Sequence, residues 1–386
     1  MKVPFDAGRL DALMEAAGLE ALLVTSKHNV QYLLGGHRAH FFHVMDAIGL
    51  SRYLPVLAYV RGAPERAAYF GARSEAAQFA NEPIWVPQVE ARFSTSIDVV
   101  EAASAYVRKL GLGAARIGIE PAFLPADSHA ALRKALPDAA LEDALVVLER
   151  LRMLKRPDEL ETLRAASELI LDSMLAVVAG HGPGVTTRAL TEALRREEVQ
   201  RGLDFEYCLI ATGSSHNRAP SNQRWEQGEV LSLDSGGNYQ GYIGDLARMA
   251  ILGKPDAELT DLLGQVESVQ QAVIGRVEPG VRGGDLFEYA HAALSRGSIG
   301  NATRFVAHGM GMISHEGPRL TNTGPVPYPA EDADRPLQAG MVLSIETSLE
   351  HPKRGFIKLE DTVAVTATGR DVLGDYARGW NEGGAG

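Results

Sequence analysis

Two stretches decide the fold expected for this chain: Gly228-Glu-Val-Leu-Ser-Leu-Asp234 and Gly340-Met-Val-Leu-Ser-Ile-Glu346. They agree at four of seven positions, and each ends an apolar run on a carboxylate. Short apolar runs bounded by turn residues are typical of buried strands. After each run a glycine starts a second segment that ends in an acid, Gly241-Tyr-Ile-Gly-Asp245 and Gly355-Phe-Ile-Lys-Leu-Glu360. The pattern predicts two similar hairpins, each carrying two acids.

The segments before the hairpins repeat as well. Lys155-Arg-Pro-Asp-Glu-Leu and Lys254-Pro-Asp-Ala-Glu-Leu each open a helical pattern, with Pro near its start, where it is tolerated. The two patterns end at Pro183-Gly184-Val185 and Pro279-Gly280-Val281. Chance similarity explains one matched segment, but four in the same order favour two copies of one α+β half. We expect the copies to pack about a pseudo-twofold axis.

The first third of the chain has a different pattern. Apolar runs typical of strands alternate with amphipathic segments typical of helices. The expected strands are 20–25, 56–60 and 116–120, and the expected helices are 7–17 and 103–110. This alternation predicts an α/β domain. We therefore expect two domains, an α/β domain over 1–150 and a duplicated α+β domain over 151–386.

Composition excludes several classes of protein. The 386 residues carry a net charge of −11, which repels phosphate backbones and argues against a nucleic-acid partner. A single cysteine, Cys208, excludes an internal disulfide and a thiolate metal cluster, and its apolar surroundings place it in the core. No apolar run approaches the roughly 18–20 residues of a membrane span. Asp6 and Asp11 interrupt the position of a signal peptide, so we expect a cytoplasmic enzyme that does not bind membranes.

The acids that end the hairpin strands are the candidate metal ligands: Asp234, Asp245, Glu346 and Glu360. A pseudo-twofold axis would bring all four together, and a charge in an apolar strand is costly unless it is paired or binds metal. Two divalent ions would neutralise four carboxylates. The alternative is that each acid caps a turn or pairs with Arg248 or Lys358. That alternative is stronger for any single acid and weaker for four at related positions.

Histidines complete the candidate site. Phe305-Val-Ala-His308-Gly-Met-Gly-Met-Ile-Ser-His315-Glu-Gly-Pro318 supplies two, and glycines after His308 allow close approach to a metal. Alone, the segment would indicate a core histidine. It lacks the Gly-Lys-Ser/Thr ending of a phosphate loop. His216 lies in a polar loop before the first hairpin and is either a surface residue or a proton shuttle.

These residues together resemble a known family. Their spacing is similar to that of the dinuclear metallopeptidases of the pita-bread fold, family M24, which include prolidase, aminopeptidase P and methionine aminopeptidase. The resemblance covers about 155–375. Asn29-Val-Gln-Tyr-Leu-Leu-Gly resembles the N-terminal domain of the creatinase, prolidase and Xaa-Pro aminopeptidase branch. The implied fold is an α/β N-terminal domain followed by a pita-bread catalytic domain.

The resemblance also implies roles for the metal ligands. Asp234 would bind one metal ion through both oxygens. Asp245 and Glu360 would bridge two ions, and His308 and Glu346 would complete the other site. A carboxylate-rich shell with one imidazole suits Mn²⁺, with Co²⁺ or Zn²⁺ as less selective alternatives.

The implied activity is hydrolysis of the Xaa-Pro bond of dipeptides or short peptides by a hydroxide that bridges the two metals. His216 and His315 would face the substrate and donate hydrogen bonds to the developing oxyanion. Glu346 would carry the proton from water to the leaving nitrogen. The partner expected is therefore a small peptide or peptide-like substrate.

Two departures from the family pattern put the substrate in question. Thr347 stands where the family usually has Pro, and Lys358 stands where it usually has Arg. Lysine cannot reproduce the planar, bidentate contact of arginine. One alternative is therefore a metal-dependent hydrolase or lyase of the same fold that acts on a small non-peptide amide or osmolyte. Another is a catalytically inactive binding homologue, which would have lost ligands.

The N-terminal domain carries a histidine cluster, His37, His40 and His43, interrupted by Phe41 and Phe42. The modest interpretation is a helix or loop of mixed polarity. The resemblance implies a homodimer in which the N-terminal domain of one subunit reaches the active site of the other. The cluster would then limit substrate length or bind the substrate's end.

Overall fold

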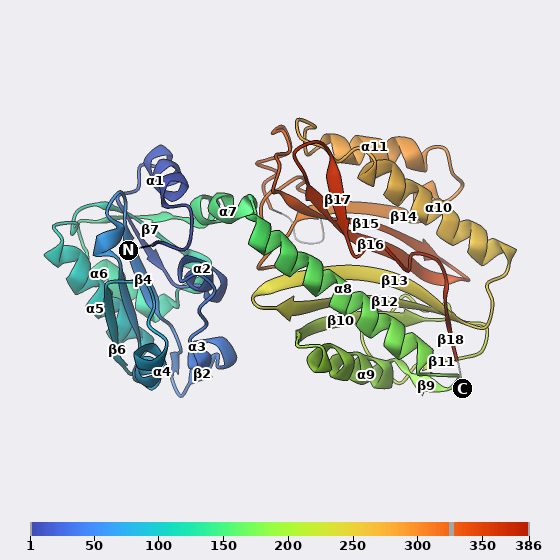
Figure 1. Cartoon of the computed structure of the whole chain (residues 1–386), viewed down its shortest axis with the longest axis horizontal. Coiled ribbons are helices and arrows are strands. Elements are labelled where there is room, and N and C mark those ends of the chain that lie inside the picture. The colour runs from blue at the N-terminus through green and yellow to red at the C-terminus, as the bar shows by residue number, and fades with distance from the viewer. Residues whose placement is uncertain (1, 324–327, 385–386) are drawn as a thin grey trace. The chain divides into compact units, whose positions relative to one another are not determined.

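The computed structural model describes residues 2–323 and 328–384. The chain forms two compact units, Met1–Arg152 and Met153–Gly386, and the division lies close to the boundary expected near residue 150. Figure 1 shows the helices and strands of each unit. Among the described helices, none has both the length and the apolar character that crossing a bilayer requires.

The N-terminal unit is built on a six-stranded sheet of order β6-β5-β4-β1-β7-β8. Its strands are β1 (Ala21–Val24), β4 (Val56–Val60), β5 (Ala68–Ala72), β6 (Gln88–Phe93), β7 (Arg116–Ile119) and β8 (Ala140–Asp143), with a small hairpin of β2 (Ala47–Ile48) and β3 (Ser51–Arg52). The α-helices are α1 (Ala7–Ala16), α2 (Lys27–Leu33), α3 (His40–Val44), α4 (Ala76–Asn81), α5 (Ser96–Lys109), α6 (Ala126–Ala135) and α7 (Leu145–Met153). Short 3₁₀ turns are η1 (Pro64–Arg66), η2 (Arg73–Glu75) and η3 (Pro121–Phe123). This mixed sheet with helices confirms the α/β prediction.

One expected helix of this unit is longer than predicted. The pattern predicted 103–110, but α5 begins at Ser96. Thr95 accepts a hydrogen bond from the backbone of Asp98, whose side chain accepts one from the backbone of Thr95. This reciprocal capping box satisfies two otherwise unpaired N–H groups and starts the helix earlier than the apolar pattern shows.

The second unit contains an eight-stranded sheet of order β10-β12-β13-β16-β15-β14, with β17 beside β16 and β18 beside β13. The strands are β10 (Asp204–Thr212), β12 (Val230–Tyr239), β13 (Tyr242–Leu252), β14 (Thr303–Gly309), β15 (Val342–His351), β16 (Gly355–Val365), β17 (Arg370–Leu373) and β18 (Asn381–Gly383). Strands β9 (Val185–Thr186) and β11 (Arg224–Trp225) form a separate two-stranded sheet. The helices are α8 (Pro157–Ala179), α9 (Thr187–Gln200), α10 (Ala257–Ile274), α11 (Asp285–Leu294) and the 3₁₀ turn η4 (Gly300–Ala302).

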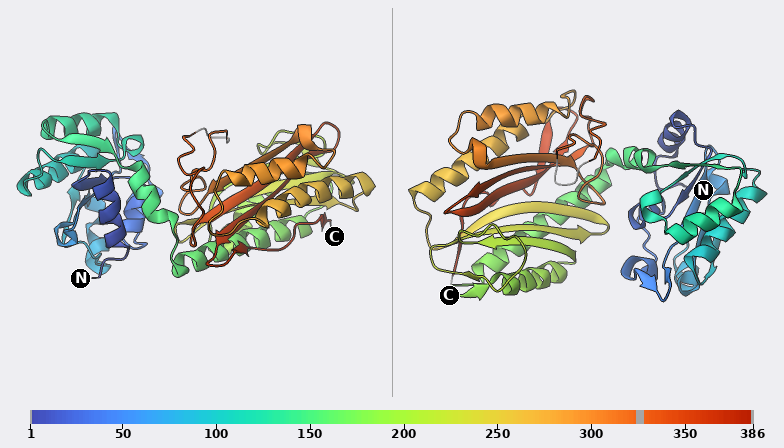
Figure 2. Two further views of the ribbon diagram at one scale, coloured as in Figure 1. Left: turned by 90° about the horizontal axis from the view of Figure 1, so that it is seen from above. Right: turned by 180° about the vertical axis from the view of Figure 1, so that it is seen from behind.

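The strand order is symmetric about the junction of β13 and β16, as two copies of one half require. The hairpins β12–β13 and β15–β16 meet there. Helices α8 and α9 pack against the first half, and α10 and α11 pack against the second. Figures 1 and 2 show these four helices on one face of the curved sheet. The expected duplication is therefore present, and it leaves the other face of the sheet for a site.

Candidate metal centre

The predicted acids lie in one row across the sheet. Asp234 is paired in register with Ala247, Ala247 with Glu360, and Glu360 with Glu346, so the row crosses β12, β13, β16 and β15. Side chains in such a row share one face of the sheet. Asp245 lies two residues before Ala247 and therefore projects to the same face. The small side chain of Ala247 leaves the centre of the row open, and the acids converge there.

Three of the predicted ligands come close enough to share one ion. One ligand atom from each of Asp245, His308 and Glu360 lies within 4.8 Å of the others, and all three residues are buried. His308 reaches the cluster from β14, where it is paired in register with Ser344. The Ser344 hydroxyl donates to Glu360 Oε1 at 2.7 Å and orients that carboxylate. Two carboxylates and an imidazole are a donor set that fits Mn²⁺ or a similar divalent ion.

An oxygen of Asp245 indicates that a ligand belongs here. Its Oδ1 atom is buried and has no hydrogen-bond partner among the described residues. A buried polar atom without a partner costs free energy, so such atoms are rare unless they have a function. Burial and the charge of Glu360 raise the pKa of Asp245 well above its ordinary value. A bound cation would give the unpartnered oxygen a ligand and would offset the repulsion between Asp245 and Glu360.

Lys358 lies at the centre of the remaining acids. Its Nζ atom is 2.6 Å from Asp234 Oδ2, 2.6 Å from Glu346 Oε2 and 2.7 Å from Glu360 Oε2. Burial alone would lower the pKa of Lys358, but the charges of Asp234 and Glu360 raise it well above its ordinary value. The alternative that the acids pair with Lys358 is therefore realised for three of the four. Arg248, the other cation considered, instead pairs with Asp361.

Arg218 is a second cation beside the row, and sequence reasoning missed it. Its guanidinium forms an ion pair with Asp234 and lies 4.7 Å from the centroid of the Phe356 ring. Asp234 Oδ2 is thus contacted by both Arg218 and Lys358. Asp234 and Glu346 are near the three-ligand cluster and are paired with protein cations, as is Glu360 through its contact with Lys358.

The histidines differ in their surroundings. The rings of His308 and His315 stack at a centroid distance of 3.7 Å, and His308 Nε2 is 3.1 Å from Glu346 Oε1. Burial and the neighbouring His308 lower the pKa of His315 to about 4, so its imidazole is neutral near pH 7. Burial would raise the pKa of Glu346, but Lys358 and His308 hold it well below its ordinary value.

A cavity of about 590 Å³ opens beside this cluster, within the second unit. Its lining includes His216, Glu346 and Lys358, so the predicted loop histidine does face the same space as the acids. The ring of His216 contacts the carbonyl oxygen of His351 at 3.1 Å through Nε2. Tyr207, which the sequence indicated only as part of an apolar strand, lies against Asp245. Burial and that contact raise the pKa of its hydroxyl far above its ordinary value.

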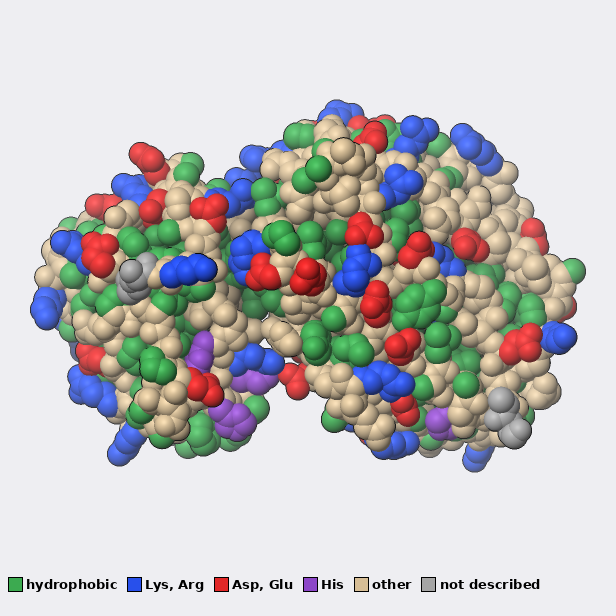
Figure 3. Space-filling model, in the orientation of Figure 1, with side chains coloured by type: hydrophobic (Ala, Val, Ile, Leu, Met, Phe, Trp, Pro, Cys, Tyr) green, Lys and Arg blue, Asp and Glu red, His purple; other side chains and the backbone are tan. Residues whose placement is uncertain are grey.

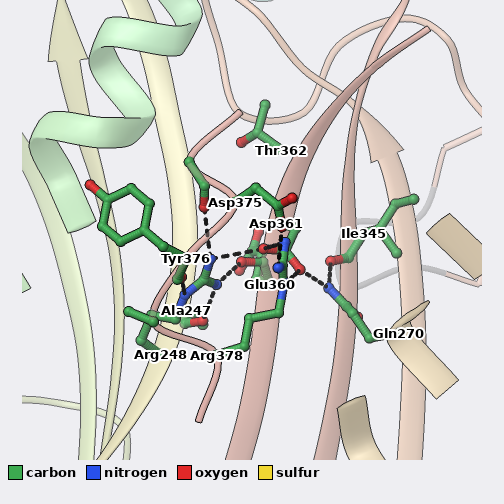
Figure 4. A network of polar contacts seen from close by, with 12 residues as sticks. Ala247, Arg248, Gln270, Ile345, Glu360, Asp361, Thr362, Asp375, Tyr376 and Arg378 are labelled. Atoms are coloured by element: carbon green, nitrogen blue, oxygen red, sulfur yellow. Dashed lines mark hydrogen bonds and ion pairs between the residues drawn. The ribbon is translucent and has the colours of Figure 1, made fainter. Parts of the chain in front are cut away.

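A polar network holds the strands of the centre in place (Figure 4). Arg248 donates to the carbonyl oxygen of Glu360 at 2.8 Å and to Asp361 Oδ1 at 2.9 Å. Gln270 Nε2 on α10 donates to Asp361 Oδ2 at 3.1 Å, and its Oε1 accepts from the Thr347 hydroxyl at 2.8 Å. Thr347, which departs from the family's usual Pro, is thus a buried member of this network. The departure alters the support of the centre and leaves the candidate ligands unchanged.

The N-terminal unit holds the three clustered histidines. His40 and His43 lie on α3, and the ring of His37 stacks on Phe79 at a centroid distance of 5.3 Å. Figure 3 shows histidine side chains gathered on the visible face of that unit. Their effect on substrate length stays a prediction. Cys208 is buried in the core of the second unit, as expected, and burial raises the pKa of its thiol to about 12.

A buried acid behind the sheet gives a prediction about stability and pH. Glu198 on α9 is fully buried and accepts a hydrogen bond from the Ser235 hydroxyl at 2.9 Å. Burial raises its pKa from 4.5 to about 8. At a pH between these two pKa values, Glu198 has lost its proton in the unfolded chain but keeps it in the folded chain. The free energy of unfolding therefore falls as pH rises through this range. We expect Glu198→Gln to be more stable by about 2–4 kcal/mol at pH 8, and little changed at pH 4.

Urea denaturation at the two pH values measures this difference. Glu192→Gln, on an exposed position of the same helix, is the matched control and should show no such pH dependence. If both variants change the free energy of unfolding equally at the two pH values, Glu198 is not protonated in the folded chain.

The duplicated sheet and its centre of acids and histidine define a metallopeptidase of the pita-bread class. Residues 161–367 match Metallopeptidase family M24, and residues 7–154 match the Creatinase/Prolidase N-terminal domain. The first match spans more than half of the chain, so the chain belongs to metallopeptidase family M24.

Individual relatives agree with the family. The chain is 24% identical to an uncharacterized peptidase, YqhT, of Bacillus subtilis over 95% of this chain and 96% of that protein. It is 25% identical to the Xaa-Pro dipeptidase of Pyrococcus furiosus over 59% of this chain and 64% of that protein. The solved structure of an Xaa-Pro dipeptidase from Bacillus anthracis has a TM-score of 0.79 at 20% identity and covers 96% of this chain and 97% of that one.

Proposed function

We propose that Asp245, His308 and Glu360 hold a divalent metal ion, and that the site hydrolyses the Xaa-Pro bond of dipeptides. The observation that carries the proposal is the cluster of three buried ligand atoms with the unpartnered oxygen of Asp245. Similarity to a named Xaa-Pro dipeptidase supports the choice of bond. In proline's peptide bond the leaving nitrogen carries no N–H, so the site must fit a ring with fixed φ.

The side chains around the cluster suit hydrolysis. A divalent ion bound there would polarise the scissile carbonyl and lower the pKa of a water molecule. His315 is neutral, so one of its ring nitrogens is a donor for the oxygen that becomes negative. Glu346 lines the cavity and is ionised, and it is the proposed proton carrier. His216, on the loop side of the cavity, is the proposed second donor.

The cavity also favours a substrate with a free carboxylate. Arg304 and Arg218 line it together with the rings of Phe305 and Phe356. Arg304 is exposed on β14 and forms no ion pair with any residue in the described part of the chain. An arginine binds a carboxylate through two parallel hydrogen bonds, and aromatic walls suit a pyrrolidine ring. Of the two activities that the sequence indicated, this arrangement favours the dipeptidase over the aminopeptidase.

The test compares Ala-Pro with its C-terminal amide in the Mn²⁺-loaded enzyme. We expect Arg304→Met to raise KM for Ala-Pro by about ten- to a hundredfold, the loss of a charged hydrogen bond, and to leave hydrolysis of the amide unchanged. Arg188→Met, which changes an exposed arginine on α9, is the control. Equal losses on both substrates would exclude a carboxylate contact at Arg304. No hydrolysis of either substrate by the unaltered enzyme would refute the proposed function.

The remaining expectations stay predictions. They are the homodimer, the cytoplasmic location, the absence of nucleic-acid and membrane partners, and the second metal ion. Asp234 and Glu346 also stay predictions as metal ligands, Asp234 in the site of the second ion and Glu346 in the site that contains His308.

A further inference from the structure

The ammonium group of Lys358 occupies a position that a cation would otherwise fill. A lysine ammonium has three N–H donors and no acceptor. Its three neighbours at 2.6, 2.6 and 2.7 Å are single oxygens of Asp234, Glu346 and Glu360, each from a different strand. The contact with Asp234 Oδ2 is a hydrogen bond, whereas Glu360 Oε2 forms an ion pair with the ammonium but has no hydrogen-bond partner among the described residues. The side chain is 6% exposed, so little water competes for these contacts.

The strand geometry gives Lys358 this position. It lies two residues before Glu360 on β16, so both side chains project to the same face of the sheet. A guanidinium is wider, planar and favours two parallel contacts with one carboxylate. The compact ammonium can instead lie between three. The substitution of Lys for the family's usual Arg therefore concentrates one positive charge at a single point among the acids.

Asp234 is contacted by two protein cations. Its Oδ2 atom accepts from both Lys358 Nζ and Arg218 Nη2. A metal ion bound by Asp234 would have to share that carboxylate with two protein cations, and like charges at such separations repel strongly in a dry site. Asp245 differs in that its Oδ1 atom is buried without a hydrogen-bond partner among the described residues.

The charges of the centre balance with one divalent ion. Asp234, Glu346 and Glu360 pair with one ammonium and one guanidinium, and Asp245 adds a fourth carboxylate, so the four acids when ionised exceed the two cations by two negative charges. A single divalent ion neutralises these, whereas two would leave the buried cluster with a net positive charge. Uncompensated charge is unfavourable in a buried site.

We propose that the ammonium of Lys358 takes the place of the second metal ion, so that the centre holds one divalent ion on Asp245, His308 and Glu360. The inference rests on the proposed function, since it assumes that this cluster binds metal. It differs from the two-ion expectation raised by the family resemblance. Lys358 acts here as a positioning residue that sets the number of ions.

The experiment measures metal content and not only activity. Metal-free protein is loaded with Mn²⁺, passed through a desalting column and analysed for bound Mn per chain. We expect about one equivalent for the unaltered chain and about two for Lys358→Met, which keeps the length of the side chain and removes its charge. Lys353→Met, at an exposed position on the turn between β15 and β16, is the matched control and should retain one equivalent.

Electron paramagnetic resonance of the unaltered enzyme gives a second measurement that needs no variant. An isolated Mn²⁺ ion gives a six-line spectrum, and two neighbouring ions give an exchange-coupled spectrum. We expect the isolated form. Two equivalents in the unaltered chain, a coupled spectrum, or one equivalent in well-folded Lys358→Met would each overturn the proposal. No bound Mn²⁺ at all would instead refute the proposed function on which it rests.

Discussion

Replacing Asp245 or Glu360 by alanine should abolish turnover. Each variant removes one of the three buried ligand atoms that lie within 4.8 Å of one another. Mutation of residues that merely support a metal ligand costs about 10–100-fold in metal affinity or activity, so loss of a ligand should exceed about 100-fold. The measurement is kcat/KM for Ala-Pro at saturating Mn²⁺, together with bound metal after desalting.

Asp261→Ala provides the control for these variants. Asp261 is an exposed acid on α10, and its replacement should leave kcat/KM and the amount of bound metal unchanged. Both ligand variants must also retain the circular dichroism spectrum of the unaltered chain. Activity preserved in either folded ligand variant would mean that the cluster is not the catalytic metal centre.

Replacing Asp361 by alanine should strongly destabilise the second unit. Asp361 is fully buried and accepts from Arg248 at 2.9 Å, from Arg378 at 3.0 Å and from Gln270 at 3.1 Å. Burial alone would raise its pKa, but Arg248 and Arg378 lower it. Its removal leaves the buried guanidinium of Arg248 without an anion, which typically costs about 3–5 kcal/mol. Urea denaturation measures the change in the free energy of unfolding.

The control lies on the same network. Asp375 is an exposed partner of Arg378, and an exposed ion pair contributes at most about 1 kcal/mol. Asp375→Ala should therefore have a small effect. Similar losses for the two variants would show that burial of the Asp361 network does not stabilise the fold.

The fold and most of the candidate ligands were predictable because they follow from local patterns. Apolar runs that end in Asp234 and Glu346 mark buried strands, and repetition of the hairpins indicates the symmetry that joins β13 to β16. The side-chain alternation of a strand also places Lys358 on the face of Glu360, so that signal was present. What the pattern does not show is that acids from three strands meet at one ammonium, because that depends on the register between strands.

Other residues of the site depend wholly on tertiary contacts. Glu198 lies in a run of charged residues that is typical of a solvated helix face, but it is buried against Ser235. Arg218 lies in a polar loop, and only the fold brings it to Asp234. Asp361 follows the candidate ligand Glu360 directly, and the alternation of side chains along the strand places it on the opposite face, where it pairs with Arg248. None of these pairings has a signal in the neighbouring sequence.

The central claim is that Asp245, His308 and Glu360 bind a divalent ion. The most direct test is X-ray diffraction from crystals grown with Mn²⁺, with data collected at the manganese absorption edge. We predict an anomalous peak contacted by the carboxylates of Asp245 and Glu360 and by the imidazole of His308. A map with no peak there, or with an occupied manganese site held by other residues, would contradict the account.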